Sequence, residues 1–322
     1  MGTSSGTAAD HRPSDAVDRT VTVGVDGSEA SLTALDWAAD EAALRGAALR
    51  IVHAGWWEPH ADTAEEGTAV VAAAERRARH RQPGVKVGIG LILEAPEYAL
   101  VRESRNALVM VLGCRGRGAV AEALLGSVSA MVARHTHCPV IVVRGPHGHG
   151  PHGRGTPVSG PHVEPPSPGR VVVGVGEYPE GSAAVRFAVE EALLWGVPLE
   201  AVRAWRRPRH TPAAHPLLAG APAHAHEQEA VETLEAALRG APENLWIRRR
   251  TVEGPARDTL LAAARDAALL VVGGHGGDDH LGRITHGVLH HARCPVAVVP
   301  EPGRTTRGPD RPAPPVHSAS EK

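Results

Sequence analysis

The segment from 111 to 129, VLGCRGRGAVAEALLGSVS, places glycines, arginines and serines between two apolar runs. Gly113 and Gly116 come first, nine residues follow, and Gly126 and Ser127 then open the second run. Glycines let a backbone approach a ligand closely, and the free N–H groups at the start of a helix attract anions. This spacing predicts a strand-to-helix loop that holds a polyphosphate.

Other side chains of the segment fit the same chemistry. Ser129 adds a hydroxyl donor, and Arg115 and Arg117 add positive charge. A Walker A loop is excluded, because it needs Gly-Lys-Ser/Thr and the chain's lysines are Lys86 and Lys322. The dinucleotide fingerprint GxGxxG is also absent after the first apolar run, where the sequence reads GVDGSEAS.

Several motifs of the chain occur twice, which predicts two copies of one fold, the first of which positions this loop. VTVGVD at Val21 returns as VVVGVG at Val171, and CPVIVV at Cys138 returns as CPVAVV at Cys294. With 322 residues, the chain has room for two domains of about 150 each. Aromatic residues make up 3% of the sequence, so Ala, Val and Leu must build the cores.

Each copy alternates short apolar runs with Ala-rich helical stretches. Runs that are apolar throughout predict strands buried on both faces, as in a parallel sheet between helix layers. We therefore expect an α/β fold of two tandem, doubly wound, parallel five-stranded sheets flanked by helices. The strands are expected near 20–25, 48–54, 85–92, 108–113 and 139–143, and again near 170–175, 198–204, 245–251, 269–273 and 295–299.

The remaining segments are poor in residues that can be buried. We expect an arm at 1–19, a Gly/Pro/His-rich linker at 145–169 and a Pro-rich tail at 301–322, all disordered or flexible, around domains at 20–144 and 170–300. The linker histidines are a weaker candidate for a metal-binding tract than for part of a plain spacer.

Composition also narrows the partners and the compartment. The net charge of -2 gives no reason to expect nucleic acid or an anionic membrane surface as partner. No apolar run is long enough to span a bilayer, and the N-terminus lacks the pattern of a secretory signal. The odd number of cysteines predicts no disulfide framework, which favours the cytoplasm.

The combination of G-xx-G-(nine residues)-G-S, VGVDGS and CPV resembles the universal stress protein family in its tandem form. The resemblance covers about 20–144 and 170–300. It implies a Rossmann-like fold of the adenine nucleotide alpha hydrolase type, with ATP, alone or with Mg2+, as the ligand. It also implies that the two copies pack as a pseudo-dimer, with the CPV strands as sheet edges.

The resemblance assigns roles to single positions. Asp26 would contact the nucleoside, and the backbone around His53 and Ala54 would recognise adenine. Cys114 stands where Ser or Thr is usual, which weakens any hydroxyl contact there. The phosphates would lie against the loop and the helix start, at Gly113, Cys114, Arg115, Gly116, Gly126, Ser127, Val128 and Ser129.

The second copy departs from this pattern. Gly176 matches Asp26, Gly282 matches Gly126, and Arg283 replaces Ser127. Five residues instead of nine separate the paired glycines, and two aspartates in that loop would repel phosphate. The second copy is expected to have lost nucleotide binding.

Structural explanations compete with the functional ones. The first-copy loop can be a tight turn without ligand, and Asp26 can cap a helix, with or without a ligand role. Cys138 and Cys294 are expected to be packed small residues. Cys114 is expected in an accessible loop with arginines that favour thiolate, although a redox role is the weaker alternative. His286, His290 and His291 are expected at the surface rather than on zinc.

The leading hypothesis is a cytoplasmic, ATP-binding, stress-response or regulatory protein that acts through nucleotide-dependent contacts with protein partners. No residue is an evident catalytic base or metal ligand, so an enzyme is not expected, although slow ATP hydrolysis stays open. One alternative is a nucleotide-free structural protein with vestigial loops. Another is an ATP-using enzyme such as an adenylyl transferase, whose SGGxDS and HxGH signatures are absent.

Overall fold

The computed structural model describes residues 20–55, 63–114, 125–144, 169–177, 182–207, 221–274 and 281–301. Strands and helices alternate through the first half in the predicted order. Its elements are β1 (Thr20–Gly24), α1 (Glu29–Arg45), β2 (Leu49–Ala54), α2 (Thr63–Arg81), β3 (Val87–Ile92), α3 (Pro96–Glu103), the short 3-10 helix η1 (Ser104–Asn106), β4 (Ala107–Gly113), α4 (Ser127–His135) and β5 (Val140–Val143).

The second half repeats this order. Its third strand begins at Ile247, two residues later than the sequence predicted. The elements are β6 (Arg170–Gly174), α5 (Ala183–Trp195), β7 (Leu199–Trp205), α6 (Ala221–Ala237), β8 (Ile247–Glu253), α7 (Ala256–Ala263), β9 (Ala267–Gly274), α8 (Arg283–His291) and β10 (Val296–Pro300).

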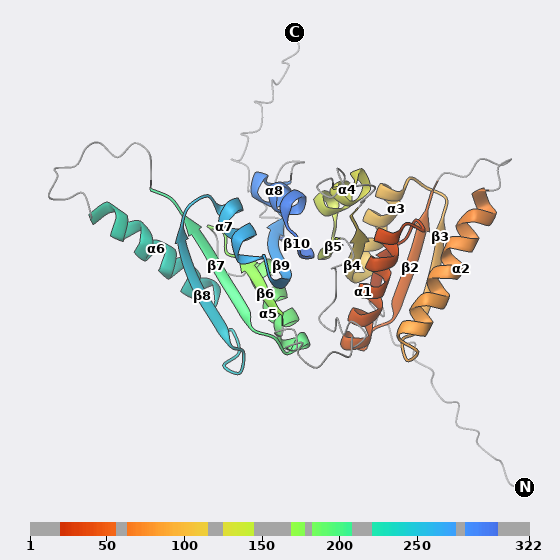
Figure 1. Cartoon of the computed structure of the whole chain (residues 1–322), viewed down its shortest axis with the longest axis horizontal. Coiled ribbons are helices and arrows are strands. Elements are labelled where there is room, and N and C mark those ends of the chain that lie inside the picture. Colours follow the sequence, from red (N-terminus) through yellow and green to blue (C-terminus); the bar gives the residue numbers. More distant parts are fainter. Residues whose placement is uncertain are drawn as a thin grey trace, which may run out of the picture.

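The strands form one ten-stranded sheet in the order β3-β2-β1-β4-β5-β10-β9-β6-β7-β8. Pairing is parallel within each half and antiparallel where β5 meets β10, with Ile141 opposite Ala297. The α/β doubly wound class is therefore confirmed, but the two expected sheets are joined into one (Figure 1). Each CPV strand is the edge of its own half, and pairing satisfies backbone groups that an edge leaves open.

Helices cover both faces of the sheet (Figure 1). One core cluster contains buried residues of α1, α2, α5 and α6, and a second contains residues of α3, α4, α7 and α8. Neighbouring residues of one strand divide between the two clusters, as Val140 and Ile141 do on β5. Ala, Val and Leu dominate both clusters, as the composition predicted. None of the described helices is both long and apolar enough to cross a membrane.

The first helix of each half starts and stops through the same local chemistry. Ser28 precedes α1 and Ser182 precedes α5, and each side chain accepts a hydrogen bond from a backbone N–H three residues later. Gly46 and Gly196 end the two helices in the left-handed conformation, at φ 61° and 65°. Glycine adopts this conformation without the steric cost of a Cβ, so both helices end at a residue that requires glycine.

Candidate functional site

The predicted site lies where the strand order of the first half reverses. Chain order runs outward from β1 in both directions, through β2 to β3 on one side and through β4 to β5 on the other. In open α/β sheets, ligands bind in the crevice at the carboxyl ends of the strands at such a reversal. Asp26 follows β1, Ala54 ends β2 and Gly113 ends β4. These three predicted residues therefore lie together at the carboxyl ends of the parallel strands.

Asp26 belongs to a tight turn that starts α1. Its Oδ1 atom accepts hydrogen bonds from the backbone N–H of Ser28 at 3.0 Å and from the Ser28 hydroxyl at 2.5 Å. The Asp26 N–H lies 3.3 Å from Ser31 Oγ, and Gly27 between them has a φ of 79°. Asp26 is therefore part of a helix-capping network, as one reading of the sequence proposed. Its residue is exposed, and its contact with a nucleoside stays a prediction.

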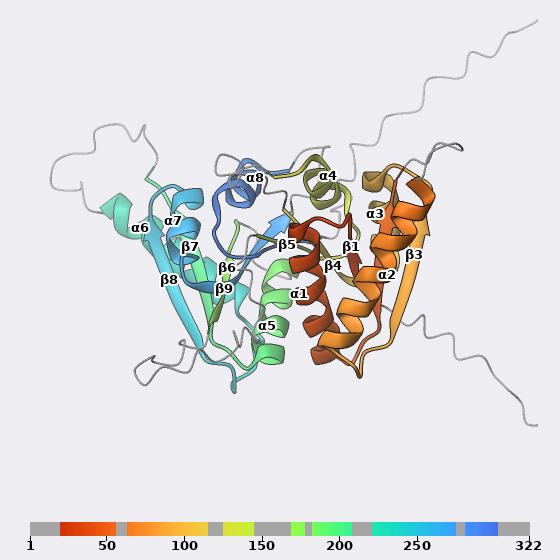
Figure 2. The same ribbon diagram turned by 45° about the vertical axis from the view of Figure 1, so that its right-hand side comes forward.

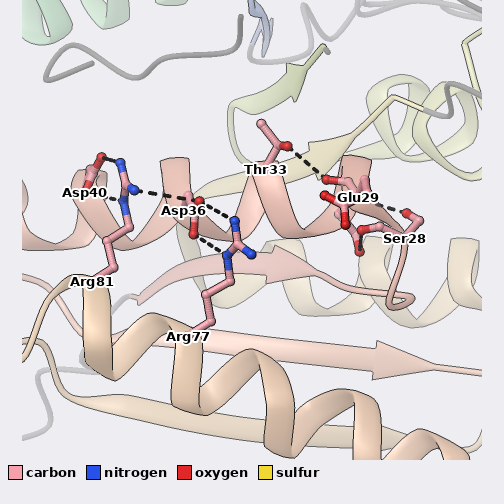
Figure 3. Close-up of polar contacts among 8 residues, drawn as sticks. Ser28, Glu29, Thr33, Asp36, Asp40, Arg77 and Arg81 are labelled. Carbon is pink, nitrogen blue, oxygen red and sulfur yellow. Dashed lines mark hydrogen bonds and ion pairs between the residues drawn. The ribbon is translucent and has the colours of Figure 1, made fainter. Parts of the chain in front are cut away.

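Two arginines hold α2 along the outer side of α1. Arg77 donates two hydrogen bonds of 2.7 Å to Asp36, and Arg81 donates two of 2.8 and 2.6 Å to Asp40. Figure 3 shows the two pairs one after the other between α1 and α2, with Ser28 at the start of α1. They hold the later turns of α2 against the middle of α1.

The end of β2 is tied to the end of β1 by a histidine. His53 Nδ1 lies 2.7 Å from the carbonyl oxygen of Val25. Because a carbonyl can only accept, His53 carries a proton on Nδ1 and donates it. Ala54 follows at the end of the strand, partly buried, where the resemblance expects the backbone to meet adenine. Its neighbour Gly55 donates its N–H to the carbonyl of Ile92 at 3.2 Å.

Gly113 is required by packing in this structure. A Cβ on Gly113 would lie 2.5 Å from the backbone carbonyl carbon and oxygen of Ala30, closer than real contacts allow. The end of β4 thus presses against the first turn of α1. The sequence pattern suggested that Gly113 is a glycine so that a ligand can approach the backbone. The contact with α1 is a second reason, and it is sufficient alone.

Cys114 contradicts the expectation of an accessible thiol. Its residue is 5% exposed, and its N–H donates to the carbonyl of Val143 at 2.9 Å. The backbone continues the pairing of β4 with β5 by one residue, which turns the side chain into the core. Arg115, Gly116 and Arg117, the remaining predicted residues of the loop, lie outside the described part of the chain.

The start of α4 presents the other predicted phosphate ligands. Gly126 precedes the helix in an extended conformation, and no side chain caps it. Ser127 is exposed, and Val128 packs partly against the core. Ser129 is buried and donates its hydroxyl to the carbonyl of Gly113 at 3.0 Å. Ser127 and the backbone N–H groups of this turn are therefore better placed than the Ser129 side chain to meet an anion.

The second half repeats the Ser129 contact with a threonine. Thr285 Oγ1 donates to the carbonyl of Gly273 at 3.0 Å. The helix start also repeats, because His286 N–H donates to Gly282 at 2.9 Å as Ala130 N–H does to Gly126. The sequence alignment of Gly282 with Gly126 is thereby confirmed, together with a loop four residues shorter.

Glu301 lies against the start of α5 in the second half, and sequence reasoning missed it. Its carboxylate accepts from Ser182 Oγ at 3.0 Å, from Ala183 N–H at 3.0 Å and from Ala184 N–H at 3.3 Å. It lies beside Gly273, where a Cβ would be 3.6 Å from Glu301 Oε1. Glu301 was expected to begin the tail. The first turn of α5 contains no acidic residue, and this was the one signal that a carboxylate could come from elsewhere.

Arg203 takes the place of His53 in the second half. It stands at the same register position on β7, and its Nη1 donates to the carbonyl of Val175 at 3.2 Å. Beyond its strand ends, the second half therefore carries an arginine and a glutamate, whereas the first half carries a histidine and Asp26. The two crevices differ in charge arrangement as well as in loop length.

Cys138 and Cys294 are buried, as expected of packed small residues. Burial raises the pKa of the Cys138 thiol to about 11 and that of Cys294 to about 12, so both stay protonated. Across the described ranges, no group of three or more His, Cys, Asp or Glu side chains is placed to hold a metal ion. His286 and His291 are exposed, and burial together with nearby cations lowers the pKa of His286.

Comparisons with known proteins agree on one family. The model of the universal stress protein family matches residues 19–144 and 168–300. Universal stress protein Rv2005c of Mycobacterium tuberculosis is 34% identical over 301 residues, which cover 86% of this chain and 96% of that protein. A solved universal stress protein from Archaeoglobus fulgidus matches with a TM-score of 0.61 at 17% identity, covering 88% of this chain and 98% of that one. A universal stress protein solved in complex with cAMP is 34% identical over 39% of this chain and 96% of its own, with a TM-score of 0.34.

Proposed function

This chain belongs to the universal stress protein family, and on that premise we propose that its first domain binds one adenine nucleotide while its second domain binds none. ATP is the ligand we favour, with or without Mg2+. The protein would act in the cytoplasm as a stress-response regulator, and binding would alter its contacts with protein partners. The proposed role is regulatory and not enzymatic.

One observation carries the proposal. The turn at Asp26, the end of β2 at Ala54 and the start of α4 at Gly126 surround the reversal point of the first half. The start of α4 has no side-chain cap, so its N–H groups and positive dipole end are not offset by a side chain of its own. This combination favours a ligand with a nucleoside at one end and phosphates at the other.

The structural contacts refine the roles of the predicted residues. Asp26 would meet the ribose and Ala54 the base. Cys114 would contribute backbone only, because its side chain is buried. Ser129 would act by holding α4 on β4 rather than by touching phosphate. The phosphate contacts would come from Gly113, Arg115, Gly116, Gly126, Ser127 and the N–H of Val128.

In the second domain, Glu301 argues against a nucleotide. Its carboxylate already accepts the hydrogen bonds at the start of α5, and a polyphosphate beside it would meet a like charge. The loop before α8 is also too short to follow the path of its counterpart. Binding in one domain would then reach the other through β5 and β10, which pair across an intramolecular pseudo-dimer.

Calorimetric titration of the full-length protein tests the proposal. ATP, AMP and cAMP would be titrated with and without Mg2+, and the ATP samples would then be separated to detect ADP or AMP. We expect saturable binding of an adenine nucleotide without multiple turnover. No binding of any of the three would overturn the proposal, and repeated turnover would overturn the non-enzymatic part of it.

A further inference from the structure

Two glutamates face each other where the first helices of the two domains meet. Glu41 lies on α1 and Glu191 on α5, and both helices lie on the same side of the sheet, side by side in Figure 2. The two residues occupy matching positions, each five residues before the glycine that ends its helix, Gly46 or Gly196. The same position of the repeated fold thus contributes an acid from each side of the domain contact.

Both glutamates are removed from solvent. Glu41 is 1% exposed and Glu191 is 0% exposed. Aromatic rings close the contact at both ends. Trp37 meets Trp195 edge to face with ring centroids 5.8 Å apart, and the guanidinium of Arg45 lies 5.9 Å from the ring centre of Phe187. Two carboxylates therefore lie in a low-dielectric contact from which water is excluded.

A single arginine donates hydrogen bonds to both carboxylates. Arg45 donates through Nε to Glu41 Oε1 at 2.5 Å and through Nη2 to Glu191 Oε1. The indole N–H of Trp195 donates to Glu41 Oε2 at 3.1 Å. Glu191 Oε2 is buried and has no hydrogen-bond partner within the described structure. If Glu191 carries a proton, this oxygen becomes a donor that can reach the neighbouring carboxylate of Glu41.

Other charged groups do not balance the second acid. On α1, Arg81 is already paired with Asp40, and on α5, both Arg186 and Glu190 are exposed to solvent. The strands beneath contribute apolar side chains, Ile141 from β5 and Ala297 from β10. Among the described residues that pack here, two acids thus face one cation.

Burial and the neighbouring charges set the direction in which the pKa of Glu191 shifts. Burial raises the pKa of Glu191 well above its usual 4.5, and the adjacent charge of Glu41 raises it further, while Arg45 opposes both. Burial favours the neutral form of an acid, and two like charges in contact disfavour full ionisation. The protonated form is the one that also satisfies Glu191 Oε2.

We propose that Glu191 keeps a proton that it donates to the carboxylate of Glu41 beside Arg45, and that this proton makes the contact between α1 and α5 a pH-sensitive joint between the two domains. Loss of the proton leaves two buried carboxylates on one arginine and weakens the joint. This joint would respond to pH with or without a bound nucleotide.

The direction of the pH effect follows from proton linkage. Between pH 4.5 and the raised pKa, the folded protein binds a proton that the unfolded chain has released. Stability is therefore highest at the acid side of this interval and falls as pH rises through it, by about tenfold in the folding equilibrium per pH unit for one proton.

Glu191→Gln tests the proposal, because glutamine is a neutral isostere of the protonated acid that can donate to Glu41. Urea denaturation would be followed from pH 5 to 9, with Glu190→Gln on the exposed side of α5 as the control. We expect Glu191→Gln to gain stability relative to wild type as pH rises, and the control to keep the wild-type profile. Parallel pH profiles for wild type and Glu191→Gln would overturn the proposal.

Infrared spectroscopy gives a readout that does not depend on unfolding. At neutral pH the wild-type protein should show the carbonyl band of a protonated carboxylic acid, lost or shifted in Glu191→Gln and in Glu41→Gln. If Glu191→Gln fails to fold, the wild-type spectrum and Glu41→Gln still decide. A neutral-pH spectrum without a protonated carboxylic acid would overturn the proton on Glu191.

Discussion

Thr285 occupies in the second domain the position that Ser129 occupies in the first. Each donates its hydroxyl at 3.0 Å to the carbonyl of the glycine at the end of a strand, Gly273 or Gly113. The contact persists in the second domain, where the loop before the helix is four residues shorter in sequence. It therefore clamps the helix to the strand in both domains, whether or not a ligand binds.

Removing either hydroxyl should cost stability. Ser129→Ala and Thr285→Val each leave a glycine carbonyl without this donor, which we expect to lower the free energy of unfolding by about 1–3 kcal/mol. Urea denaturation of the two variants measures this loss of stability. If Ser129→Ala kept full stability but lost ATP affinity, its hydroxyl would be a direct ligand instead of a clamp.

A negative side chain at the start of α4 should abolish nucleotide binding. Gly126→Asp places a carboxylate where phosphate would approach, so ATP titration should show no saturable binding. Gly282→Asp is the matched control at the same position of the second domain, and it should bind ATP with wild-type affinity. Equal losses in both variants would point to general destabilisation, and near-normal binding by Gly126→Asp would move the site elsewhere.

Glu301 should stabilise the start of α5. Glu301→Ala removes the acceptor of the Ser182, Ala183 and Ala184 hydrogen bonds, and loss of a helix cap typically costs about 1 kcal/mol. Native-state amide exchange should speed up in the first turn of α5 and stay unchanged in the first turn of α1. Unchanged exchange at Ala183 and Ala184 would show that Glu301 does not cap the helix.

The two domains should stay together when the connection between them is cut. A protease site inserted in 145–169 leaves the pairing of β5 with β10 and the contact of α1 with α5 intact. Size-exclusion chromatography after cleavage should give one species with the mass of the whole protein. Two separate, independently folded halves would contradict an intramolecular pseudo-dimer.

Much of the fold could be predicted from local patterns. Apolar runs, helix starts and the repeated CPV motif indicated the strands and helices, because these signals lie within a few residues of each other. The joining of the halves into one sheet needed the register of Ile141 opposite Ala297, which no local pattern contains.

Residues whose role depends on distant partners were missed or misjudged. Cys114 was expected in solvent because glycines and arginines surround it in sequence, but pairing with Val143 turns it inward. Glu301 looked like the start of a polar tail because its partners lie 117 to 119 residues earlier. Glu41 and Glu191 each look like an ordinary helical acid, and only the packing of α1 on α5 brings them together.

Nucleotide stoichiometry tests the central claim most directly. Equilibrium dialysis of the full-length protein against labelled ATP, at concentrations far above the dissociation constant, counts the ligands bound per chain. Both α4 and α8 start without a side-chain cap, but the first half has Asp26 and the longer loop, whereas Glu301 lies at the start of α5 in the second half, so we predict a value of one. A value near two would show that the second domain binds ATP despite Glu301 and its short loop, and a value near zero would contradict nucleotide binding altogether.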